Sequence, residues 1–179
     1  PGAAGRAACH AETMLDVLFG TMGGWPEEVR RGRRLTVALY RPMGSEIDPA
    51  PLARALIGLS CDLCLPVVER LDAPLVFRAW TTGQALRPDL VGSAAPLPDA
   101  PQVDPELIIA PLLAFDAFGH RLGQGGGYYD RTFAARPDAV RVGLAWAAQQ
   151  VERLPAEGHD MPLRGVLTES GYMPAGKAD

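Results

Sequence analysis

The sequence predicts an α/β protein built as a three-layer, mostly parallel open sheet with helices on both faces. Short apolar runs alternate along the chain with segments of helical pattern, which is the order of an α/β fold. The runs are continuously apolar, as expected of parallel strands that are covered on both faces. A chain of 179 residues, 47% hydrophobic and 21% charged, is long enough for one sizeable core. We therefore expect one domain over residues 1–179.

Three segments carry helix signals. The first runs from Ala3 to Phe19 and ends at Gly20, with apolar positions at Met14, Leu15, Leu18 and Phe19. The second follows Asp48 as N-cap and Pro49 at the first helical position, with an inner face of Leu52, Leu56 and Leu59. The third, Tyr128 to Arg136, contains neither Gly nor Pro.

Five apolar runs are predicted as strands: Leu35–Tyr40, Leu63–Val68, Leu75–Trp80, Leu107–Pro111 and Val140–Ala145. We expect right-handed crossovers between parallel strands, with ligands bound beyond the carboxyl ends of the strands. Three loops are predicted to meet there: the glycine-rich loop described below, Met43–Glu46 and His159–Asp160. The long connection from Thr81 to Pro105, rich in Pro, Gly and Ala, is predicted to cover the substrate.

Composition excludes several classes of function. A net charge of −4 provides no electrostatic footprint for nucleic acid, so we expect no nucleic-acid partner. No signal peptide or membrane-spanning run is visible, which predicts a cytoplasmic protein without a membrane partner. Cys9, Cys61 and Cys64 form no zinc set. Buried thiols are expected, and a redox pair of Cys61 and Cys64 is the alternative.

The most informative segment is Gly119–Arg131, which holds five glycines and two arginines. Glycines let successive backbone N–H groups approach an anion, and the predicted helix that follows directs its N-terminal dipole at the same point. Arg121 and Arg131 would add charge-assisted hydrogen bonds to phosphate oxygens. The segment lacks the Lys-Ser/Thr end of a Walker A loop. A flexible surface turn is the alternative interpretation.

Asp130 stands beside the predicted anion, where the like charges would repel each other unless a cation lay between them. Mg²⁺ is commonly held by one or two carboxylates together with phosphates. The residues therefore predict a nucleotide phosphate with a divalent metal. An ion pair of Asp130 with Arg121 or Arg131 on the surface is the alternative.

Phe115-Asp116 followed by Gly119–Arg131 resembles the signature of the 5-formyltetrahydrofolate cyclo-ligases, also called 5,10-methenyltetrahydrofolate synthetases. Flanking segments agree with that family: Tyr40–Asp48, Leu65–Val68, Leu75–Trp80, Val142–Ala145 and Glu157–Leu163. The resemblance implies a Rossmann-like sheet of the NagB/RpiA/CoA-transferase-like kind. It also implies 5-formyltetrahydrofolate and ATP as substrates, Mg²⁺ as cofactor, and a monomer or weak dimer.

In that family ATP phosphorylates the formyl oxygen, a neighbouring nitrogen attacks the activated carbon, and loss of phosphate closes the methenyl bridge. The resemblance assigns catalysis to Arg121 and Tyr129, and the metal to Asp130 and Asp160. It assigns ATP to Arg121, Leu122, Gly123, Gln124, Gly125, Gly126, Gly127, Tyr128, Tyr129 and Asp130. It assigns the folate to Glu46, Arg41, Met43, Trp80, Gly125, Gly126, Gly127 and Tyr128. For Met43 and Trp80, which could line an apolar pterin slot, core packing is the alternative. The alternatives for Asp160 and Glu46 are a turn cap before Pro162 and a solvated loop carboxylate.

Some roles stay open at this level. Of the adjacent tyrosines, one is predicted to line the pocket and the other to pack in the core. His120 and His159 are predicted to orient neighbours rather than to carry protons. The resembled family opens with a helix that bears a Lys and an Arg, whereas Arg6 is the only basic residue before Arg30. We therefore expect the chain to lack that N-terminal basic segment, and a non-catalytic nucleotide- or folate-binding module that has lost turnover is the alternative.

Overall fold

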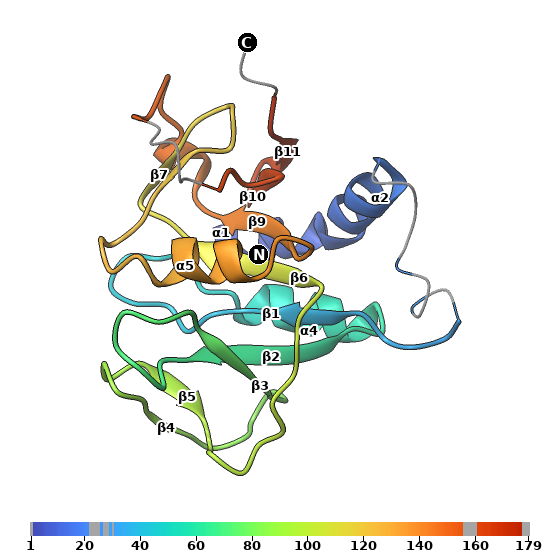
Figure 1. Ribbon diagram of the computed structural model, residues 1–179. Helices are drawn as coiled ribbons and strands as arrows, with labels where there is room; N and C mark the ends of the chain where they lie inside the picture. The colour runs from blue at the N-terminus through green and yellow to red at the C-terminus, as the bar shows by residue number, and fades with distance from the viewer. Residues whose placement is uncertain (1, 22–25, 27–28, 30, 156–160, 177–179) are drawn as a thin grey trace.

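The computed structural model describes residues 2–21, 26, 29, 31–155 and 161–176 and has a central seven-stranded sheet (Figure 1). Its strand order is β11-β10-β9-β6-β1-β2-β3. The five inner strands run parallel, and the two outer strands, β3 and β11, pair antiparallel with their neighbours. The strands are β1 Thr36–Ala38, β2 Asp62–Val67, β3 Val76–Ala79, β6 Leu107–Pro111, β9 Val140–Leu144, β10 Gly165–Thr168 and β11 Gly171–Pro174.

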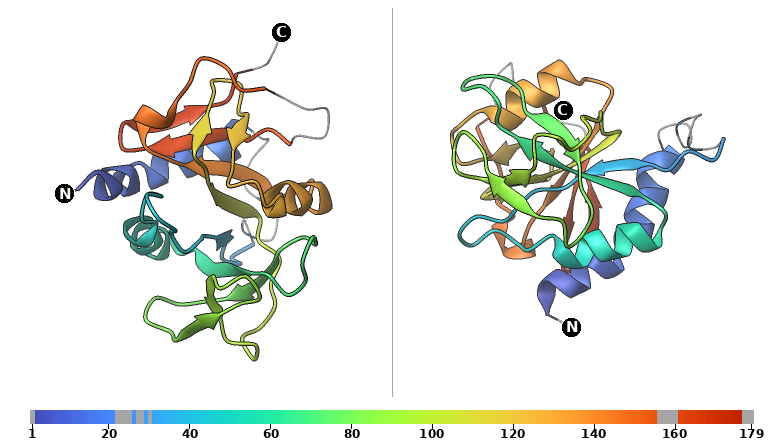
Figure 2. Two further views of the ribbon diagram at one scale, coloured as in Figure 1. Left: turned by 90° about the vertical axis from the view of Figure 1, so that its left-hand side faces the viewer. Right: turned by 90° about the horizontal axis from the view of Figure 1, so that it is seen from below.

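Helices cover both faces of this sheet (Figure 2). On one face lie α1 Ala3–Cys9, α2 Ala11–Thr21 and α4 Ala50–Gly58, and on the other lies α5 Tyr128–Ala135. A short 3₁₀ helix, η1 Ala147–Gln149, follows β9. The predicted fold class, a mostly parallel α/β sheet between two helical layers, is confirmed.

Two helix predictions need correction. The segment predicted as one helix is broken at His10, whose N–H bonds to Ala7 O at 3.1 Å in a tighter turn that ends α1. Helix α4 starts at Ala50 with Pro49 as N-cap, although the Asp48 carboxylate still accepts a hydrogen bond from Ala50 N–H. Because α4 ends at Gly58, Leu59 does not belong to its inner face.

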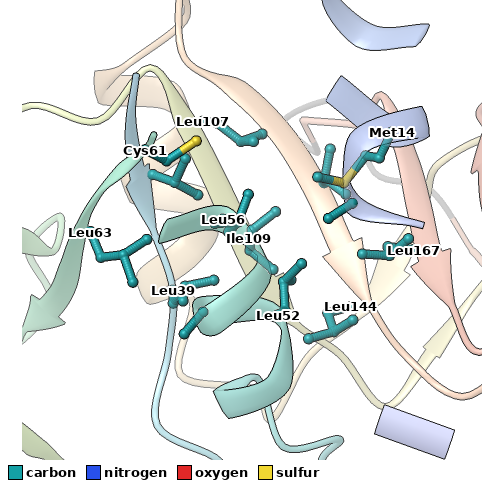
Figure 3. Packing of buried hydrophobic residues seen from close by; sticks show 14 of the residues in the cluster. Met14, Leu39, Leu52, Leu56, Cys61, Leu63, Leu107, Ile109, Leu144 and Leu167 are labelled. Atoms are coloured by element: carbon teal, nitrogen blue, oxygen red, sulfur yellow. The ribbon is translucent and has the colours of Figure 1, made fainter. Parts of the chain in front are cut away.

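Two hydrophobic clusters fill the space between the layers. Met14 of α2, Leu56 of α4 and Ile109 of β6 belong to the first cluster, where Leu56 lies beside Ile109 (Figure 3). Ile108, the neighbour of Ile109, points to the other face and packs with Phe133 of α5 in the second cluster. Successive side chains of a strand alternate between faces, so a strand buried on both sides must be continuously apolar.

Strands β10 and β11 and two small hairpins are absent from the predicted elements. One hairpin pairs β4 Leu86–Pro88 with β5 Ala94–Pro96, and the other pairs β7 Ala114–Phe115 with β8 Arg121–Leu122. Each of these strands has four residues or fewer, which is too short to show the alternation of apolar and polar residues that marks a strand. The long connection between β3 and β6, for which no strand was predicted, therefore contains the β4–β5 hairpin.

The cysteines of the CxxC pair lie in different clusters. Cys61 packs in the first cluster and Cys64 in the second. Burial raises the pKa of Cys61 to about 11, and burial raises the pKa of Cys64 further still. Both are therefore protonated, buried thiols, as predicted. Within the part of the chain that the structure describes, no helix is long and apolar enough to cross a membrane.

Candidate functional site

A cavity of about 720 Å³ opens beyond the carboxyl ends of the parallel strands. Tyr40 follows β1, Pro66 lies near the end of β2, and Pro111 ends β6. The remaining lining residues are Arg41, Met43, Glu46, Val68, Leu75, Asp89, Val91, Ser93, Ala94, Leu112, Arg121, Leu122, Gly123, Gln124, Gly125, Gly126, Gly127, Tyr128, Tyr129, Asp130, Leu154 and Pro155. The parallel topology thus places the cavity where an open α/β sheet binds ligands.

Two of the three loops expected to converge do so. Gln124 Nε2 of the glycine-rich loop donates a hydrogen bond of 2.8 Å to Glu46 Oε1. The same glutamate accepts a bond from Met43 N–H through Oε2, which closes its own loop. Tyr40 stabilises the end of this loop, because its buried hydroxyl donates a hydrogen bond of 2.7 Å to Ile47 O. His159 and Asp160 lie outside the described residues.

The glycine-rich loop, residues 123–127, leads directly into α5. The β7–β8 hairpin lies between β6 and this loop. Gly125 and Gly127 have φ values of 87° and 64°, in the left-handed region that side chains with a Cβ rarely adopt. Gly127 is the N-cap of α5. A Cβ on Gly123 would lie 2.9 Å from Arg121 Nη1, so the loop is packed closely against this cation.

Arg121 is the buried cation of the cavity. Its side chain is 7% exposed, and its Nη2 donates to Asp130 Oδ1 at 2.6 Å. The guanidinium lies over the rings of Tyr129 and Phe133, at 5.6 and 5.3 Å from their centroids. Its Nε is buried without a hydrogen-bond partner. The ion pair with Asp130 was one of the two alternatives that the sequence left open.

Arg131 does not line the cavity, contrary to expectation. Its Nη2 donates to Gly126 O at 2.7 Å, and its guanidinium lies 5.0 Å from the centroid of the Tyr128 ring. A Cβ on Gly127 would lie 2.8 Å from Arg131 Nη1. The Arg131 side chain therefore contacts the backbone of the glycine-rich loop on the side away from the cavity. Its hydrogen bond to Gly126 O stabilises the conformation of this loop.

Tyr128 and Tyr129 both line the cavity and both pack against the second cluster, so the expected division between them is wrong. They occupy the first turn of α5, around which the cavity wraps. The Tyr129 ring lies 5.9 Å from that of Phe133. Burial raises the pKa of Tyr129 well above its ordinary value and outweighs the nearby Arg121. Its hydroxyl is therefore a hydrogen-bond donor at neutral pH and not a base.

Among the assigned residues that the structure describes, Trp80 is the one that does not lie at this cavity. It borders a separate cavity of about 590 Å³ with Arg34, Cys61 and Val103. The reason is strand direction: β3 pairs antiparallel with β2, so its carboxyl end lies at the opposite edge of the sheet. The start of β3, marked by Leu75, lies at the cavity instead. The assignment of Trp80 to the folate is therefore wrong, and its alternative, packing in the first cluster, is what the structure shows.

Several wall residues were not recognised from the sequence. Asp89 accepts hydrogen bonds from the N–H groups of Val68, Val91 and Ser93, which fixes the β4–β5 hairpin against the end of β2. No local signal marks these positions. Tyr40 was detectable, since it directly follows a predicted strand at the ligand-binding edge.

Comparisons with known proteins agree with this architecture. The model of the 5-formyltetrahydrofolate cyclo-ligase family matches residues 27–169. This chain belongs to that family. The 5-formyltetrahydrofolate cyclo-ligase of Escherichia coli (strain K12) is 36% identical over 146 residues, which cover 75% of this chain and 78% of the relative. That of Haemophilus influenzae is 34% identical over 138 residues, covering 73% and 74%.

A solved structure extends the similarity to the fold. The 5,10-methenyltetrahydrofolate synthetase of Aquifex aeolicus superimposes with a TM-score of 0.69 at 30% identity, covering 97% of this chain and 84% of that one. The chain is accordingly an ATP-dependent ligase of folate one-carbon metabolism. It converts 5-formyltetrahydrofolate to 5,10-methenyltetrahydrofolate.

Proposed function

We propose that ring closure takes place in the 720 Å³ cavity, with the ATP phosphates in the glycine-rich loop and the folate between this loop and Met43–Glu46. One observation carries the proposal: a loop with two left-handed glycines, the start of α5 and a buried arginine with an unused N–H line the same cavity. Backbone N–H groups at a helix start and a guanidinium are the donors that phosphate oxygens require.

Residues 121–130 would hold ATP. Gly125 and Gly127 let the backbone approach the phosphates without a Cβ in the way. Arg121 would place its cation beside the transferred phosphoryl group, where fixed charge stabilises the transition state more than a mobile charge in water would. Tyr129, as a protonated hydroxyl next to Arg121, would donate a further hydrogen bond.

The donor set also fits Mg²⁺. Asp130 lies at the start of α5, its side chain is 40% exposed, and Arg121 is its hydrogen-bond partner through one oxygen. No cluster of three or more His, Cys, Asp or Glu side chains suited to a metal occurs in the described part of the chain. We assign the cation to a position shared with the phosphates of ATP, held by Asp130 and by Asp160. When bound, Mg²⁺ would neutralise the charge that develops on the phosphates.

The reaction then needs alignment rather than a protein nucleophile. The formyl oxygen attacks the terminal phosphorus of ATP, and ADP leaves. The neighbouring folate nitrogen attacks the activated carbon, and phosphate leaves with the former formyl oxygen. Glu46 would accept hydrogen bonds from the pterin, while Arg41 and the half-exposed Met43 would border the folate. Closely oriented reactants supply much of such a rate enhancement.

The test is formation of the methenyl chromophore when protein, ATP, Mg²⁺ and 5-formyltetrahydrofolate are mixed. We expect Arg121→Ala to lower kcat/KM by about a hundredfold or more, the loss typical of one preorganised donor. Arg87→Ala is the matched control, because Arg87 is an exposed arginine that does not line this cavity. An Arg121→Ala enzyme of ordinary activity would show that the phosphates bind elsewhere.

A further inference from the structure

Asp116 has no role in the proposed chemistry, and it does not line the cavity. Asp116 follows β7 and is 2% exposed. The other buried polar or charged residues in the described ranges are Thr132, Arg141 and Thr168, so Asp116 is the single buried carboxylate among them. A buried anion is costly unless hydrogen bonds compensate it. Its partners therefore indicate what it holds.

Four donors converge on this carboxylate. Oδ1 accepts from the N–H groups of Phe118 at 2.9 Å and His120 at 3.0 Å. Oδ2 accepts from His120 Nδ1 at 2.9 Å and from Leu154 N–H at 3.0 Å. Burial by itself would raise the pKa of Asp116, but the bonds from Leu154, His120 and Phe118 together lower it below its ordinary value. Asp116 is thus ionised and fully bonded.

These bonds join two walls of the cavity. Through Oδ1, Asp116 fixes the turn of the β7–β8 hairpin, and Arg121 is the next residue after that turn. Through Oδ2, it fixes the backbone of Leu154 in the opposite segment. A backbone bond from Val151 N–H to Phe115 O at 2.8 Å runs beside it. Arg121 and Leu154 both line the cavity, whereas Asp116 does not.

His120 belongs to the same junction. Because Nδ1 faces a carboxylate, the proton is assigned to Nδ1, and the ring acts as a donor. His120 does not line the cavity. A ring that is committed to Asp116 and turned away from the cavity holds the turn and does not transfer protons to the substrate.

We propose that Asp116 is a positioning residue for ring closure, which sets Arg121 on the hairpin at a fixed place relative to the Leu154 wall. The inference rests on the proposed role of Arg121 in holding ATP. Because the carboxylate joins two segments that are 38 residues apart, neither segment by itself could impose that spacing. Misplacing a binding group by about 1 Å is enough for a loss of up to a hundredfold.

The first experiment is a double-mutant cycle of Asp116→Asn with Arg121→Ala. For each variant, calorimetry measures the ATP affinity, and steady-state kinetics measure kcat/KM for both substrates. The Asn amide has one acceptor oxygen instead of two, so either the turn N–H groups or Leu154 N–H lose their acceptor. We expect Asp116→Asn to lower kcat/KM by about tenfold to a hundredfold. In the Arg121→Ala background, the same change should cost less than about twofold, because the residue through which Asp116 acts is already gone.

A second series keeps the carboxylate and changes its partner. His120→Ala removes one donor of four and should lower kcat/KM by about fivefold, the usual effect of one hydrogen bond. His120→Asn places an Nδ2–H where Nδ1–H stood and should restore ordinary activity. Asp104→Asn is the control, since Asp104 pairs with Arg136 on the surface. This series decides the question if Asp116→Asn does not fold.

The outcomes separate the two proposals. An Arg121→Ala protein with ordinary ATP affinity would overturn the proposed function and this inference together. If Arg121→Ala is impaired but the Asp116→Asn loss simply adds to it, only the positioning role is overturned. A His120→Asn enzyme as weak as His120→Ala would show that the imidazole itself takes part in the chemistry, and would equally contradict the inference.

Discussion

At the residue scale, the glycine-rich loop depends on backbone conformations that few residues adopt. Gly125 and Gly127 are left-handed, while Gly126 has an ordinary φ and faces the ring of Tyr128. The strain that a Cβ would create therefore lies at Gly125 and Gly127, on either side of Gly126. Arg131 covers Gly127 from outside, so any side chain at Gly127 would also displace this guanidinium.

We predict that Gly127→Ala weakens ATP binding by about tenfold, because a residue with a Cβ costs about 1–2 kcal/mol in the left-handed region. Calorimetry with ATP and Mg²⁺ measures the change. Gly20→Ala is the matched control, since Gly20 lies in α2 with open space around its Cα. Unchanged ATP affinity in Gly127→Ala would mean that the loop does not contact the phosphates.

Asp130 gives a second residue-scale prediction. With Mg²⁺ present, Asp130→Asn should weaken ATP binding by about tenfold or more, since charged ligands and charge-assisted bonds contribute about 1.5–3 kcal/mol. Without Mg²⁺, the same variant should bind ATP more tightly than the unchanged protein, because a repelling charge is gone and Arg121 is released. Calorimetry at both conditions is decisive. A variant that keeps its full Mg²⁺ dependence contradicts the metal role of Asp130.

At the element scale, the β7–β8 hairpin carries Arg121 into the cavity and is held by Asp116. A carboxylate whose pKa is lowered in the folded state adds stability above its unfolded pKa of about 3.9, and this stability is lost as pH falls through the folded pKa. Asp116→Asn should therefore lower the free energy of unfolding by about 1–3 kcal/mol at pH 7. The difference from the unchanged protein should shrink below about pH 4.

Urea denaturation from pH 7 down to pH 3 tests this prediction. Asp104→Asn provides the comparison, because its carboxylate is exposed and its removal should change unfolding little. A difference between the unchanged protein and Asp116→Asn that stayed constant over this range would show that the Asp116 charge is not what the hairpin requires.

At the scale of the whole molecule, the cavity walls come from loops after β1 and β6, from both hairpins and from the start of α5. A ligand that contacts all of these elements binds the folded state and not the unfolded chain, so it raises the free energy of unfolding. We expect ATP with Mg²⁺, at a hundred times its dissociation constant, to stabilise the fold by about 2.7 kcal/mol. For a chain of this size, that raises the unfolding temperature by roughly 5–10 °C.

Thermal unfolding followed by circular dichroism measures that shift. Arg121→Ala should abolish most of it, and Arg87→Ala should leave it intact, because only the first lines the cavity. An equal shift in the two variants would place the ATP site outside this cavity.

The sequence by itself determined the layers and the need for glycine in the loop. Leu107–Pro111 could be predicted as an inner strand because burial on both faces demands a continuous apolar run. Residues 123–127 could be predicted as a loop with unusual backbone conformations because left-handed positions need glycine, and the binding of phosphate by this loop stays a prediction. Both are local requirements, so a local pattern reveals them.

Only the tertiary structure decided which side chains meet. Trp80 was placed at the wrong edge because the direction of β3 is set by its pairing with β2, not by its own residues. Arg131 was expected in the cavity because the sequence does not show on which side of the loop α5 carries it. Asp116 has no visible role until Leu154, 38 residues away, lies against it. Contacts between segments distant in the chain leave no local pattern, and they exist only once the sheet has brought those segments together.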